Sequence, residues 1–504
     1  MSKPSYILAL DQGTTSSRAI LFSQDLHVCA ISQREFAQLY PCPGWVEHDP
    51  EAIWLSQRTV MADVLKRAEC ELSTVAAIAV ANQRETVVVW NRHTGRPIYN
   101  AIVWQCRRTA GLCEELKRKG AESEVRDKTG LVLDAYFSAT KIRWILDHVD
   151  GAKEAARHGD LLCGTIDAWL IWKLSGGASH VTDVTNASRT LLFNIHSLSW
   201  DDDLLDLFGV PPSMLPAVVP SSGCAALGHL PEFGRCEIPI AGVAGDQQAA
   251  LFGQGCFAPG QVKNTYGTGC FLLMNTGSDP VSSRNGLLTT LTAQTRPGMP
   301  SYALEGSVFM GGAVMQWLRD ELQLLSRSSD AGGIAASVPD TGGVYLVPAF
   351  AGLGAPHWDM HARGALVGMT RGTGRRQIVR AAEEAIAYQC YDVVEAMRAD
   401  SGRSVSLLRV DGGASSDDFL MQFQSDVLGC CIERPACMET TASGAAALAA
   451  LALGWHTLES LGSRPAEARF TPSMPATQRE RLVAGWRKAI SRASGWVDTE
   501  VTNR

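Results

Sequence analysis

The chain has 504 residues, of which 46% are hydrophobic and 19% charged, as is typical of a folded protein with about two to four domains. These fractions exclude a disordered or fibrous chain. The formal net charge of −7 is mildly acidic, which argues against general nucleic-acid binding because that needs a basic surface, so we expect no nucleic-acid partner.

The N-terminal residues lack the apolar stretch of a secretory signal. The longest low-polarity segment, residues 445–453, is alanine-rich and too short to cross a bilayer, so we expect a buried helix there. The cysteines form no CxxC pair, which favours reduced core thiols over a Cys/His metal centre. We therefore expect a cytoplasmic protein without a transmembrane segment.

The first element is predicted to be a strand–turn–strand hairpin. An apolar run at residues 6–10 ends in a turn, residues 11–15, that contains a carboxylate, a glycine and two hydroxyls, and a second apolar run follows at residues 19–22. The amides and hydroxyls of such a turn suit a phosphate tail, and Asp11 suits a magnesium ion, which prefers hard oxygen ligands. An ordinary tight turn is the alternative interpretation.

Next along the chain, the spacing of apolar residues predicts a helix over residues 51–69 and a buried strand over residues 75–81. This alternation indicates an α/β fold with mixed sheets covered by helices. Arg84 and Glu85 follow the strand and could hydrogen-bond a polyol, the arginine as donor and the glutamate as acceptor. A surface ion pair is the alternative for these two residues.

In residues 242–249, a second apolar strand is followed directly by Asp246. Its carboxylate could accept a hydroxyl proton during phosphoryl transfer, or it could cap the helix that follows. A second strand–turn–strand at residues 262–274 carries a Gly-Thr-Gly turn and partly repeats the first hairpin. We place the boundary between two related halves in the glycine-rich residues 253–260 and expect a nucleotide in the cleft between them.

A third strand–turn element spans residues 408–416 and is followed by an amphipathic helix over residues 417–428. Its paired glycines would let a ring or a ribose approach the backbone, or the turn is merely capped by Ser416 or Asp417. The aromatic residues that could flank the carbon chain of a substrate, or alternatively belong to the core, are Trp104, Tyr136 and Phe271.

Taken together, these motifs resemble the bacterial glycerol kinases of the FGGY family of carbohydrate kinases, over essentially the whole chain. The resemblance implies two actin-like (ribonuclease H-like) ATPase domains, with mixed sheets flanked by helices and a cleft between them. It implies a domain over residues 1–253 with the glycerol site and the first phosphate hairpin. Residues 254–504 would form the second domain, with the nucleotide site, the second hairpin and the C-terminal helices. The segments that carry the resemblance are residues 11–18, 82–86, 102–109, 136–144, 245–253, 264–271, 352–358 and 411–424.

The resemblance also implies the reaction, which is ATP-dependent phosphorylation of glycerol to sn-glycerol 3-phosphate in glycerol catabolism. It implies Mg²⁺ as cofactor, placed by Asp11, and a homodimer or homotetramer. The residues implied to bind glycerol are Arg84, Glu85, Trp104, Tyr136, Asp246, Gln247 and Phe271, with Asp246 as general base. The residues implied to bind the nucleotide are Thr14, Thr15, Ser16 and Arg18 at the phosphates and Thr268, Gly312, Gln316, Gly413 and Asp417 in the second domain.

Four segments depart from the family pattern. Asp417 stands where many relatives carry Asn, and a carboxylate cannot donate a hydrogen bond as an amide does. Glu237 aligns with an arginine that binds fructose 1,6-bisphosphate in some relatives, although Arg235 is close by. His229 is misplaced for the histidine phosphorylated in others, and residues 474–479 lack the acidic residue that meets a transport regulator. We therefore expect three regulatory controls to be absent: binding of fructose 1,6-bisphosphate, phosphorylation of a histidine and contact with the transport regulator.

Two other functions remain open. A pentulose kinase of the same family usually shows a Gln-x-His-Gly segment where this chain has residues 82–85. An ATP-driven conformational module of the chaperone or actin type would need no small substrate, so glycerol-dependent ADP release separates it from a kinase.

Overall fold

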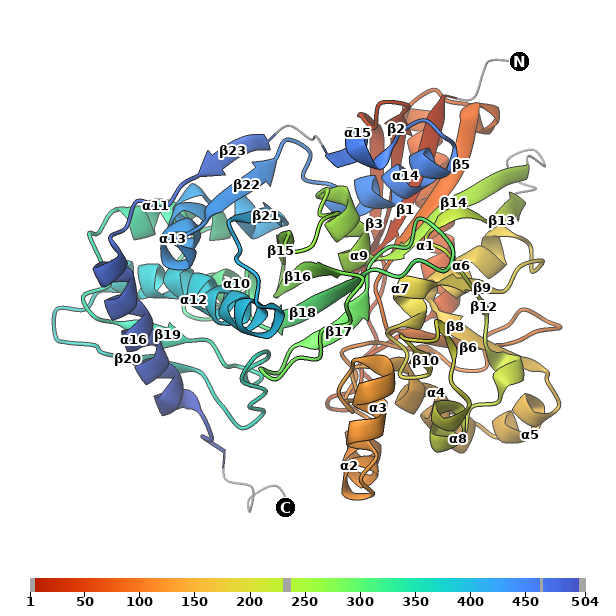
Figure 1. Cartoon of the computed structure of the whole chain (residues 1–504), viewed down its shortest axis with the longest axis horizontal. Helices are drawn as coiled ribbons and strands as arrows, with labels where there is room; N and C mark the ends of the chain where they lie inside the picture. Colours follow the sequence, from red (N-terminus) through yellow and green to blue (C-terminus); the bar gives the residue numbers. More distant parts are fainter. Residues whose placement is uncertain (1–4, 230–236, 463–465, 498–504) are drawn as a thin grey trace.

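The computed structural model describes residues 5–229, 237–462 and 466–497, which form two bodies side by side (Figure 1). The first body is built on a six-stranded sheet. Its strands, in spatial order, are β13 (Ser222–His229), β14 (Glu237–Gly245), β5 (Val75–Asn82), β1 (Tyr6–Gln12), β2 (Ser16–Ser23) and β3 (Val28–Glu35).

The predicted first hairpin is confirmed, because β1 and β2 pair antiparallel with Asp11 opposite Arg18. The predicted strand at residues 75–81 is β5, which runs parallel to β1. Successive residues of β1 face opposite sides of the sheet and both sides are covered, which explains why the strand is apolar throughout.

The second body is built on a seven-stranded sheet. Its strands, in spatial order, are β17 (Leu288–Leu291), β18 (Tyr302–Val308), β16 (Cys270–Gly277), β15 (Val262–Tyr266), β21 (Leu407–Asp411), β22 (Cys431–Pro435) and β23 (Ala466–Phe470).

The two sheets share one topology. In each, three antiparallel strands (β3-β2-β1 and β18-β16-β15) are followed by two that run parallel to the last of them (β5-β14 and β21-β22). The partial sequence repeat is therefore a repeat of the fold, and the predicted α/β class with two related, mixed-sheet halves of actin-like type is confirmed.

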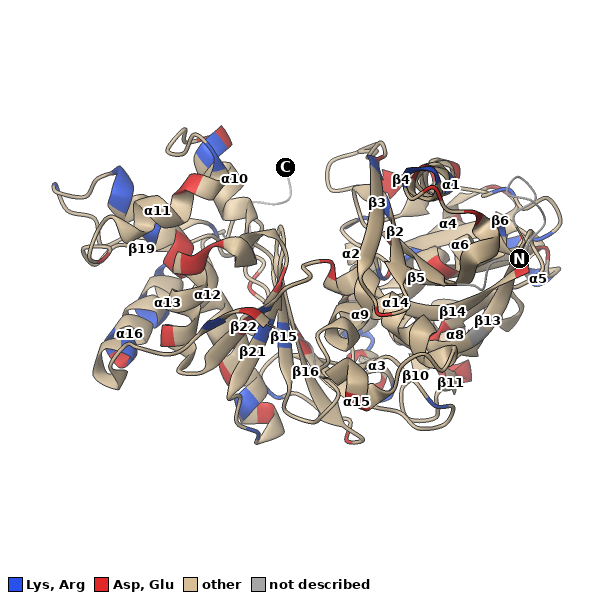
Figure 2. Ribbon diagram, turned by 90° about the horizontal axis from the view of Figure 1, so that it is seen from above, with Lys and Arg blue, Asp and Glu red and all other residues tan. Residues whose placement is uncertain are grey.

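Helices flank both sheets, and Figure 2 shows the two bodies from above, with acidic and basic residues on each. The helix predicted over residues 51–69 is α1, which begins after the side chain of Asp49 caps it. The helices before residue 254 are α1 (Pro50–Arg67), α2 (Ala110–Arg118), α3 (Glu122–Thr129), α4 (Ser138–His148), α5 (Ala152–Arg157), α6 (Ile166–Leu174), α7 (Val184–Ala187), α8 (Asp202–Phe208) and α9 (Asp246–Gly253). Those after it are α10 (Ala313–Asp320), α11 (Ala331–Ala336), α12 (Arg375–Ser401), α13 (Asp418–Leu428), α14 (Thr440–Ala452), α15 (Leu458–Gly462) and α16 (Ala476–Ala493).

Helix α14 belongs to the second half of the chain but packs on the sheet of the first body. Its alanines share one buried cluster with Ile7 and Ala9 of β1, while Leu8 and Leu10 face α1 and α6 on the other side. The buried helix predicted at residues 445–453 is thus confirmed, and it carries the chain back across the boundary expected near residue 253. The division at that residue stays a prediction.

Short strands complete the fold. A four-stranded sheet in the first body is formed by β4 (Glu47–His48), β7 (Ala101–Ile102), β6 (Val87–Asn91) and β8 (Leu161–Thr165). The two-stranded pairs are β10 (Phe193–Asn194) with β11 (Ser199–Trp200), β12 (Ala217–Val219) with β9 (Val181–Asp183), and β19 (Tyr345–Val347) with β20 (Ala365–Val367). Across the described chain, no helix is both long enough and apolar enough to span a membrane.

Candidate functional site

The carboxyl ends of β1, β5 and β14 lie at one edge of the first sheet, because the three strands run parallel with their last residues in register. Three predicted residues, Arg84, Glu85 and Asp246, leave the sheet at this edge and converge. The Arg84 Nε atom lies 3.4 Å from Asp246 Oδ1 and 3.8 Å from Glu85 Oε1. The central expectation from the sequence, one polar cluster built from two distant segments, agrees with this geometry.

Two backbone features let these side chains meet. Gly245 has no side chain where Arg84 passes, and a Cβ there would lie 2.7 and 2.8 Å from the Arg84 Cγ and Cδ atoms. Glu85 has a φ of 61°, a left-handed conformation that non-glycine residues rarely adopt. The Ser138 hydroxyl donates to the Glu85 carbonyl at 3.1 Å and helps to hold that conformation. Strain of this kind gathers at functional sites.

Two charged residues that the sequence analysis did not single out complete the cluster. Glu305 of β18 accepts bonds from Arg84 Nη1 and Nη2 at 2.6 and 2.8 Å. Arg189 donates from Nε to Glu85 at 2.6 Å and from Nη2 to Glu305 at 3.1 Å. The four residues form a buried ring of alternating charge, and Glu305 brings the second body into it.

Burial alone would raise the pKa of Glu305, but the charges of Arg189 and Arg84 hold it at about 2, so this carboxylate stays ionised. Glu305 could have been found in the sequence as the single carboxylate inside the apolar strand over residues 302–308. A lone charge in a buried strand needs a partner of opposite charge.

Asp246 is the first residue of α9 and its side chain is 29% exposed, which leaves it open to a ligand. Burial raises the pKa of Asp246, while Arg84 and then Lys263 lower it. The backbone N–H of Gln247 donates to Asp246 Oδ1 at 2.7 Å. Because Gly245 occupies the capping position, Asp246 is not the N-cap that the alternative interpretation expected.

Lys263 of β15 is a further residue that the sequence analysis missed. It is fully buried, and its Nζ atom donates to Gln247 Oε1 and, at 2.8 Å, to Thr265 Oγ1. The sequence shows a lysine inside the predicted second hairpin, but it does not show that Gln247 on α9 is its partner.

The three predicted aromatic residues lie together beside the charged ring. The Trp104 ring centroid is 5.5 Å from that of Tyr136 and 6.4 Å from that of Phe271, both in edge-to-face geometry. The Arg189 guanidinium lies 5.7 Å from the centroid of the Tyr136 ring. Phe271 comes from β16, so both bodies contribute to this aromatic wall.

The turn of the first hairpin is held by side chains from other elements. Trp104 Nε1 donates to Thr14 Oγ1 at 3.0 Å, Gln38 Nε2 to the Thr14 carbonyl at 3.0 Å, and Gln83 Nε2 to the Gly13 carbonyl at 3.2 Å. Thr15 is exposed and Ser16 half-buried at the tip. The turn is thus preorganised with its polar groups accessible, as phosphate binding requires.

Asp11 and Arg18 sit at the base of this hairpin. Burial raises the pKa of Asp11 to about 6, the Arg18 charge opposes that rise, and Asp246 and Glu439 add to it. The Arg18 guanidinium pairs with Glu439, the residue before α14.

The described residues contain no group of three or more His, Cys, Asp or Glu side chains that could hold a metal by themselves. A magnesium ion on a nucleotide needs only one or two protein carboxylates, with phosphates and waters as its other ligands. The oxygen of Asp11, at the end of a phosphate-type hairpin, fits that donor set.

The predicted nucleotide residues of the second body lie at the corresponding edge of its sheet. The Gly311 N–H donates to the Thr268 carbonyl at 2.8 Å, and the Gly312 N–H to the Gly267 carbonyl at 2.9 Å, which places α10 against the second hairpin. Thr268, Gln316 and Gly413 are exposed, and a Cβ on Gly413 would meet open space. This edge is therefore open to a ligand.

Asp417 has a local role. Its Oδ1 atom accepts from the N–H groups of Phe419 and Leu420 at 2.9 and 3.2 Å, so it is the N-cap of α13, which confirms that alternative. A Cβ on Gly332 of α11 would lie 2.2 Å from both carboxyl oxygens. Glu383 of α12 is buried nearby, and burial followed by the Asp417 charge raises its pKa. Contact between Asp417 and a nucleotide stays a prediction.

Among the residues considered for regulation, Arg235 lies outside the described residues. Glu237 opens β14 opposite His229 of β13, and both are exposed. Arg479 of α16 lies over Gly429, where a Cβ would be 2.3 Å from its Nη1 atom.

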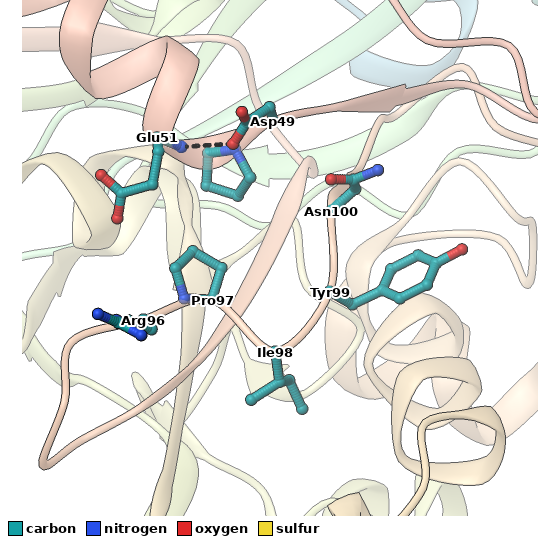
Figure 3. Close-up of a pocket in the computed structure, with 8 residues that line it drawn as sticks. Asp49, Glu51, Arg96, Pro97, Ile98, Tyr99 and Asn100 are labelled. Atoms are coloured by element: carbon teal, nitrogen blue, oxygen red, sulfur yellow. Dashed lines mark hydrogen bonds between the residues drawn. The ribbon is translucent and has the colours of Figure 1, made fainter.

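A separate hollow of about 560 Å³ lies between the start of α1 and residues 96–100, and it contains none of the predicted site residues (Figure 3). Its side chains already have structural roles: Asp49 caps α1, Glu51 pairs with Lys173, and Asn100 donates to Glu47.

Comparison with known proteins agrees with the geometry. Residues 6–253 match the N-terminal domain, and residues 262–453 the C-terminal domain, of the FGGY family of carbohydrate kinases. Glycerol kinase from Carboxydothermus hydrogenoformans is 58% identical over 97% of this chain and 98% of its own length. Glycerol kinase from Symbiobacterium thermophilum is 59% identical over 97% of this chain and 99% of its own length.

Among solved structures, Plasmodium falciparum glycerol kinase with ADP superposes with a TM-score of 0.92 at 37% identity, covering 98% of this chain and 99% of that one. The family resemblance and the fold expected from the sequence are therefore confirmed. The chain belongs to the FGGY family of carbohydrate kinases.

Proposed function

We propose that this chain phosphorylates glycerol with ATP and releases sn-glycerol 3-phosphate and ADP. The observation that carries the proposal is the convergence of Arg84, Glu85 and Asp246 at one sheet edge, beside the aromatic wall. The high identity to glycerol kinases over nearly the whole chain supports glycerol as the substrate.

Glycerol binding would use donors and acceptors together. Arg84 offers N–H groups, while the carboxylates of Glu85 and Asp246 accept from hydroxyls. The buried ring with Glu305 and Arg189 fixes the first two side chains before substrate arrives, which lowers the entropy cost of binding. Trp104 and Phe271 would contact the carbon chain, with Tyr136 and Gln247 completing the set.

Asp246 is proposed as the general base. As a terminal glycerol oxygen bonds to the γ-phosphorus, its proton passes to the Asp246 carboxylate and the bond to the ADP oxygen breaks. The raised pKa of Asp246 suits this step because it moves the carboxylate toward the proton affinity that a base needs near neutral pH.

The phosphates would lie between the two hairpins. Thr14, Thr15, Ser16 and Arg18 would bind them from the first body and Thr268 from the second, close to Gly312, Gln316, Gly413 and Asp417. A magnesium ion held at Asp11 would neutralise phosphate charge during transfer. From the family relationship we also propose that the protein is cytoplasmic and forms a homodimer or homotetramer. Each chain would divide into domains over residues 1–253 and 254–504. The three regulatory controls would be absent.

A coupled assay for ADP, run with glycerol, xylulose, ribulose and dihydroxyacetone and without any acceptor, tests the function. We expect ADP formation that depends on glycerol, with sn-glycerol 3-phosphate as product. Faster turnover of a pentulose would identify a pentulose kinase instead. ADP formation that is independent of every acceptor would favour an ATP-driven conformational module.

Regulation and assembly have their own measurements. Activity at millimolar fructose 1,6-bisphosphate is expected to stay unchanged, and a clear drop would contradict that expectation. Light scattering after size-exclusion chromatography would report the oligomeric state, and a monomer would contradict the proposed assembly.

A further inference from the structure

Lys263 is buried where a lysine is costly, in the strand that leads to the second hairpin. Its exposed fraction is 0%, and removing an ammonium group from water is unfavourable unless charged or polar partners replace the solvent. Two such partners are hydrogen-bonded to Nζ: Gln247 Oε1 on α9 of the first body and Thr265 Oγ1 on β15. The bond to Gln247 therefore crosses from one half of the chain to the other.

The bond to Gln247 fixes the orientation of its amide. An ammonium group only donates, so the Gln247 atom that faces it must be the oxygen, and the NH₂ group must point elsewhere. The Gln247 backbone N–H donates to Asp246 Oδ1 at 2.7 Å, and the Gln247 backbone and side chain both lower the pKa of the Asp246 carboxyl. Lys263 is thus bonded to the residue that is itself bonded to the proposed base.

The charged groups around Lys263 come from several elements. Two carboxylates, Asp411 of β21 and Asp246 of α9, favour its charged form more strongly than Glu305 of β18 does, whereas Arg84 opposes it. Asp411 is also engaged by Gln254 Nε2 at 2.9 Å and by Thr440 Oγ1 at 2.7 Å. Asp246 has the more open side chain of the two neighbouring carboxylates, so it is the one that can exchange a proton with a substrate.

We propose that Lys263 is a positioning residue for the reaction: it holds the Gln247 amide in one orientation and adds to Arg84 a second positive charge that favours the ionised form of Asp246 before proton transfer. Lys263 itself neither gains nor loses a proton in the step, because the glycerol hydroxyl proton goes to Asp246. The inference rests on the proposed function, in which Asp246 is the base.

If the charge of Lys263 acts on Asp246, removing it should change how the reaction rate depends on pH. Burial lowers the pKa of Lys263 to about 8, so the ammonium is charged throughout the acidic range in which Asp246 takes up its proton. Without that charge, Asp246 would be protonated at higher pH than in the wild type. The acidic limb of the rate profile would therefore move toward neutral pH, and activity would recover as the pH rises.

The test compares Lys263→Met with Lys141→Met, since Lys141 is also fully buried and burial also lowers its pKa to about 8. Lys141 donates to the carbonyls of Tyr136 and Phe137 at 2.6 and 2.9 Å, and the site carboxylate that shifts its pKa is Glu85 rather than Asp246. For each variant, kcat and kcat/KM for glycerol are measured at saturating ATP from about pH 5.5 to 9.5.

In Lys263→Met we expect the acidic limb to move up by about one pH unit, which gives a deficit of about 10-fold at low pH that shrinks as the pH rises. In Lys141→Met the limb should stay at the wild-type position whatever happens to kcat. Lys263→Gln also removes the charge and should move the limb in the same way, so it tests the same claim if the methionine variant fails to fold. Lys263→Arg keeps the charge and should keep the wild-type limb.

An unmoved limb in Lys263→Met, or an equal shift in Lys141→Met, would overturn the proposal. Asp246→Asn separates the two levels of inference. If Asp246→Asn keeps its turnover, the assignment of the base is wrong and the role of Lys263 falls with it. If Asp246→Asn is inactive while the Lys263→Met limb is unmoved, only the role of Lys263 is wrong.

Discussion

The turn between β1 and β2 and the turn between β15 and β16 occupy equivalent places in the two sheets, but they are held in different ways. The first is closed by a backbone bond from the Gly13 N–H to the Ser16 carbonyl at 3.0 Å, and in addition it is held by the side chains of Trp104, Gln38 and Gln83, with Asp11 and Arg18 at its base. The second is held by backbone bonds: the Gly267 N–H donates to the Gly269 carbonyl at 2.9 Å, and Gly311 and Gly312 donate to the carbonyls of residues 267–268.

The difference indicates a division of labour within one repeated fold. The first hairpin supplies charge and side-chain hydroxyls, so its variants should act through electrostatics and pH. The second supplies close backbone packing, so its variants should act through steric fit. Each of the following changes tests one side of this contrast.

Among the changes that test this contrast, the largest effect is expected from Gly269→Ala in the second hairpin. A Cβ at this position would lie 2.5 Å from the Val308 carbonyl oxygen, so the backbone must shift. We expect a loss of about 1–3 kcal/mol in the free energy of unfolding and a KM for ATP raised on the order of 10-fold. Denaturant unfolding and steady-state kinetics measure both.

Gly333→Ala is the matched control, because a Cβ there meets nothing within 4 Å. Its stability should equal or slightly exceed that of the wild type, since alanine favours the helix more than glycine does. If both variants behave alike, the steric account of the second hairpin is wrong.

Asp11→Asn in the first hairpin should lower activity and raise stability at once. The pKa of Asp11 rises from 3.8 to about 6, so its ionised form destabilises the ligand-free fold above about pH 6. The variant should therefore gain about 1–2 kcal/mol of unfolding free energy at pH 8 and nothing below about pH 4. Thermal unfolding across this range, with no nucleotide or metal present, measures the gain.

The same variant should need more magnesium at saturating ATP, because a neutral amide binds the ion less well than a carboxylate. A magnesium requirement equal to that of the wild type would remove Asp11 from the proposed metal site. A stability gain of equal size at every pH would contradict the role of its charge.

Trp104→Phe should have a moderate effect. It keeps an aromatic ring but loses the bond from Nε1 to the Thr14 hydroxyl at 3.0 Å. The lost bond corresponds to about 1 kcal/mol, or roughly a five-fold higher KM for ATP, with less change in KM for glycerol. The opposite ranking of the two KM values would place Trp104 with the polyol alone.

Glu439→Gln should have the smallest effect. It removes the negative charge from the ion pair with Arg18. The side chains of Arg18 and Glu439 are 26% and 30% exposed, and such exposed pairs contribute about 0.2–1 kcal/mol. Freed from Glu439, Arg18 should bind phosphate slightly better, which lowers KM for ATP about two-fold in low salt. A difference that persists in high salt would show that the pair acts through packing.

The sequence predicted the hairpins, α1, β5, α13 and the convergence of the polar cluster, because each depends on local signals: apolar runs, glycine turns and polar residues at strand ends. It missed Glu305 and Arg189, since their partners lie far away in the chain: Arg84 and Glu305 are separated by 221 positions. A lone charge in an apolar strand indicates a buried partner without identifying it.

Helix α14 shows the same limit for packing. Its sequence is apolar on every side, which predicts burial, yet nothing in it specifies the sheet of the first body as its partner. For Asp417, the sequence offered both a cap and a nucleotide contact. The structure places its carboxylate on the α13 amides and leaves the contact untested.

The most direct test of the proposed chemistry is the turnover of Asp246→Asn with glycerol, measured by the coupled ADP assay while tryptophan fluorescence follows glycerol binding. Asparagine keeps the size of the side chain but cannot take up the proton, so kcat should fall roughly 10²-fold or more with glycerol still bound. Turnover near the wild-type level would contradict the account.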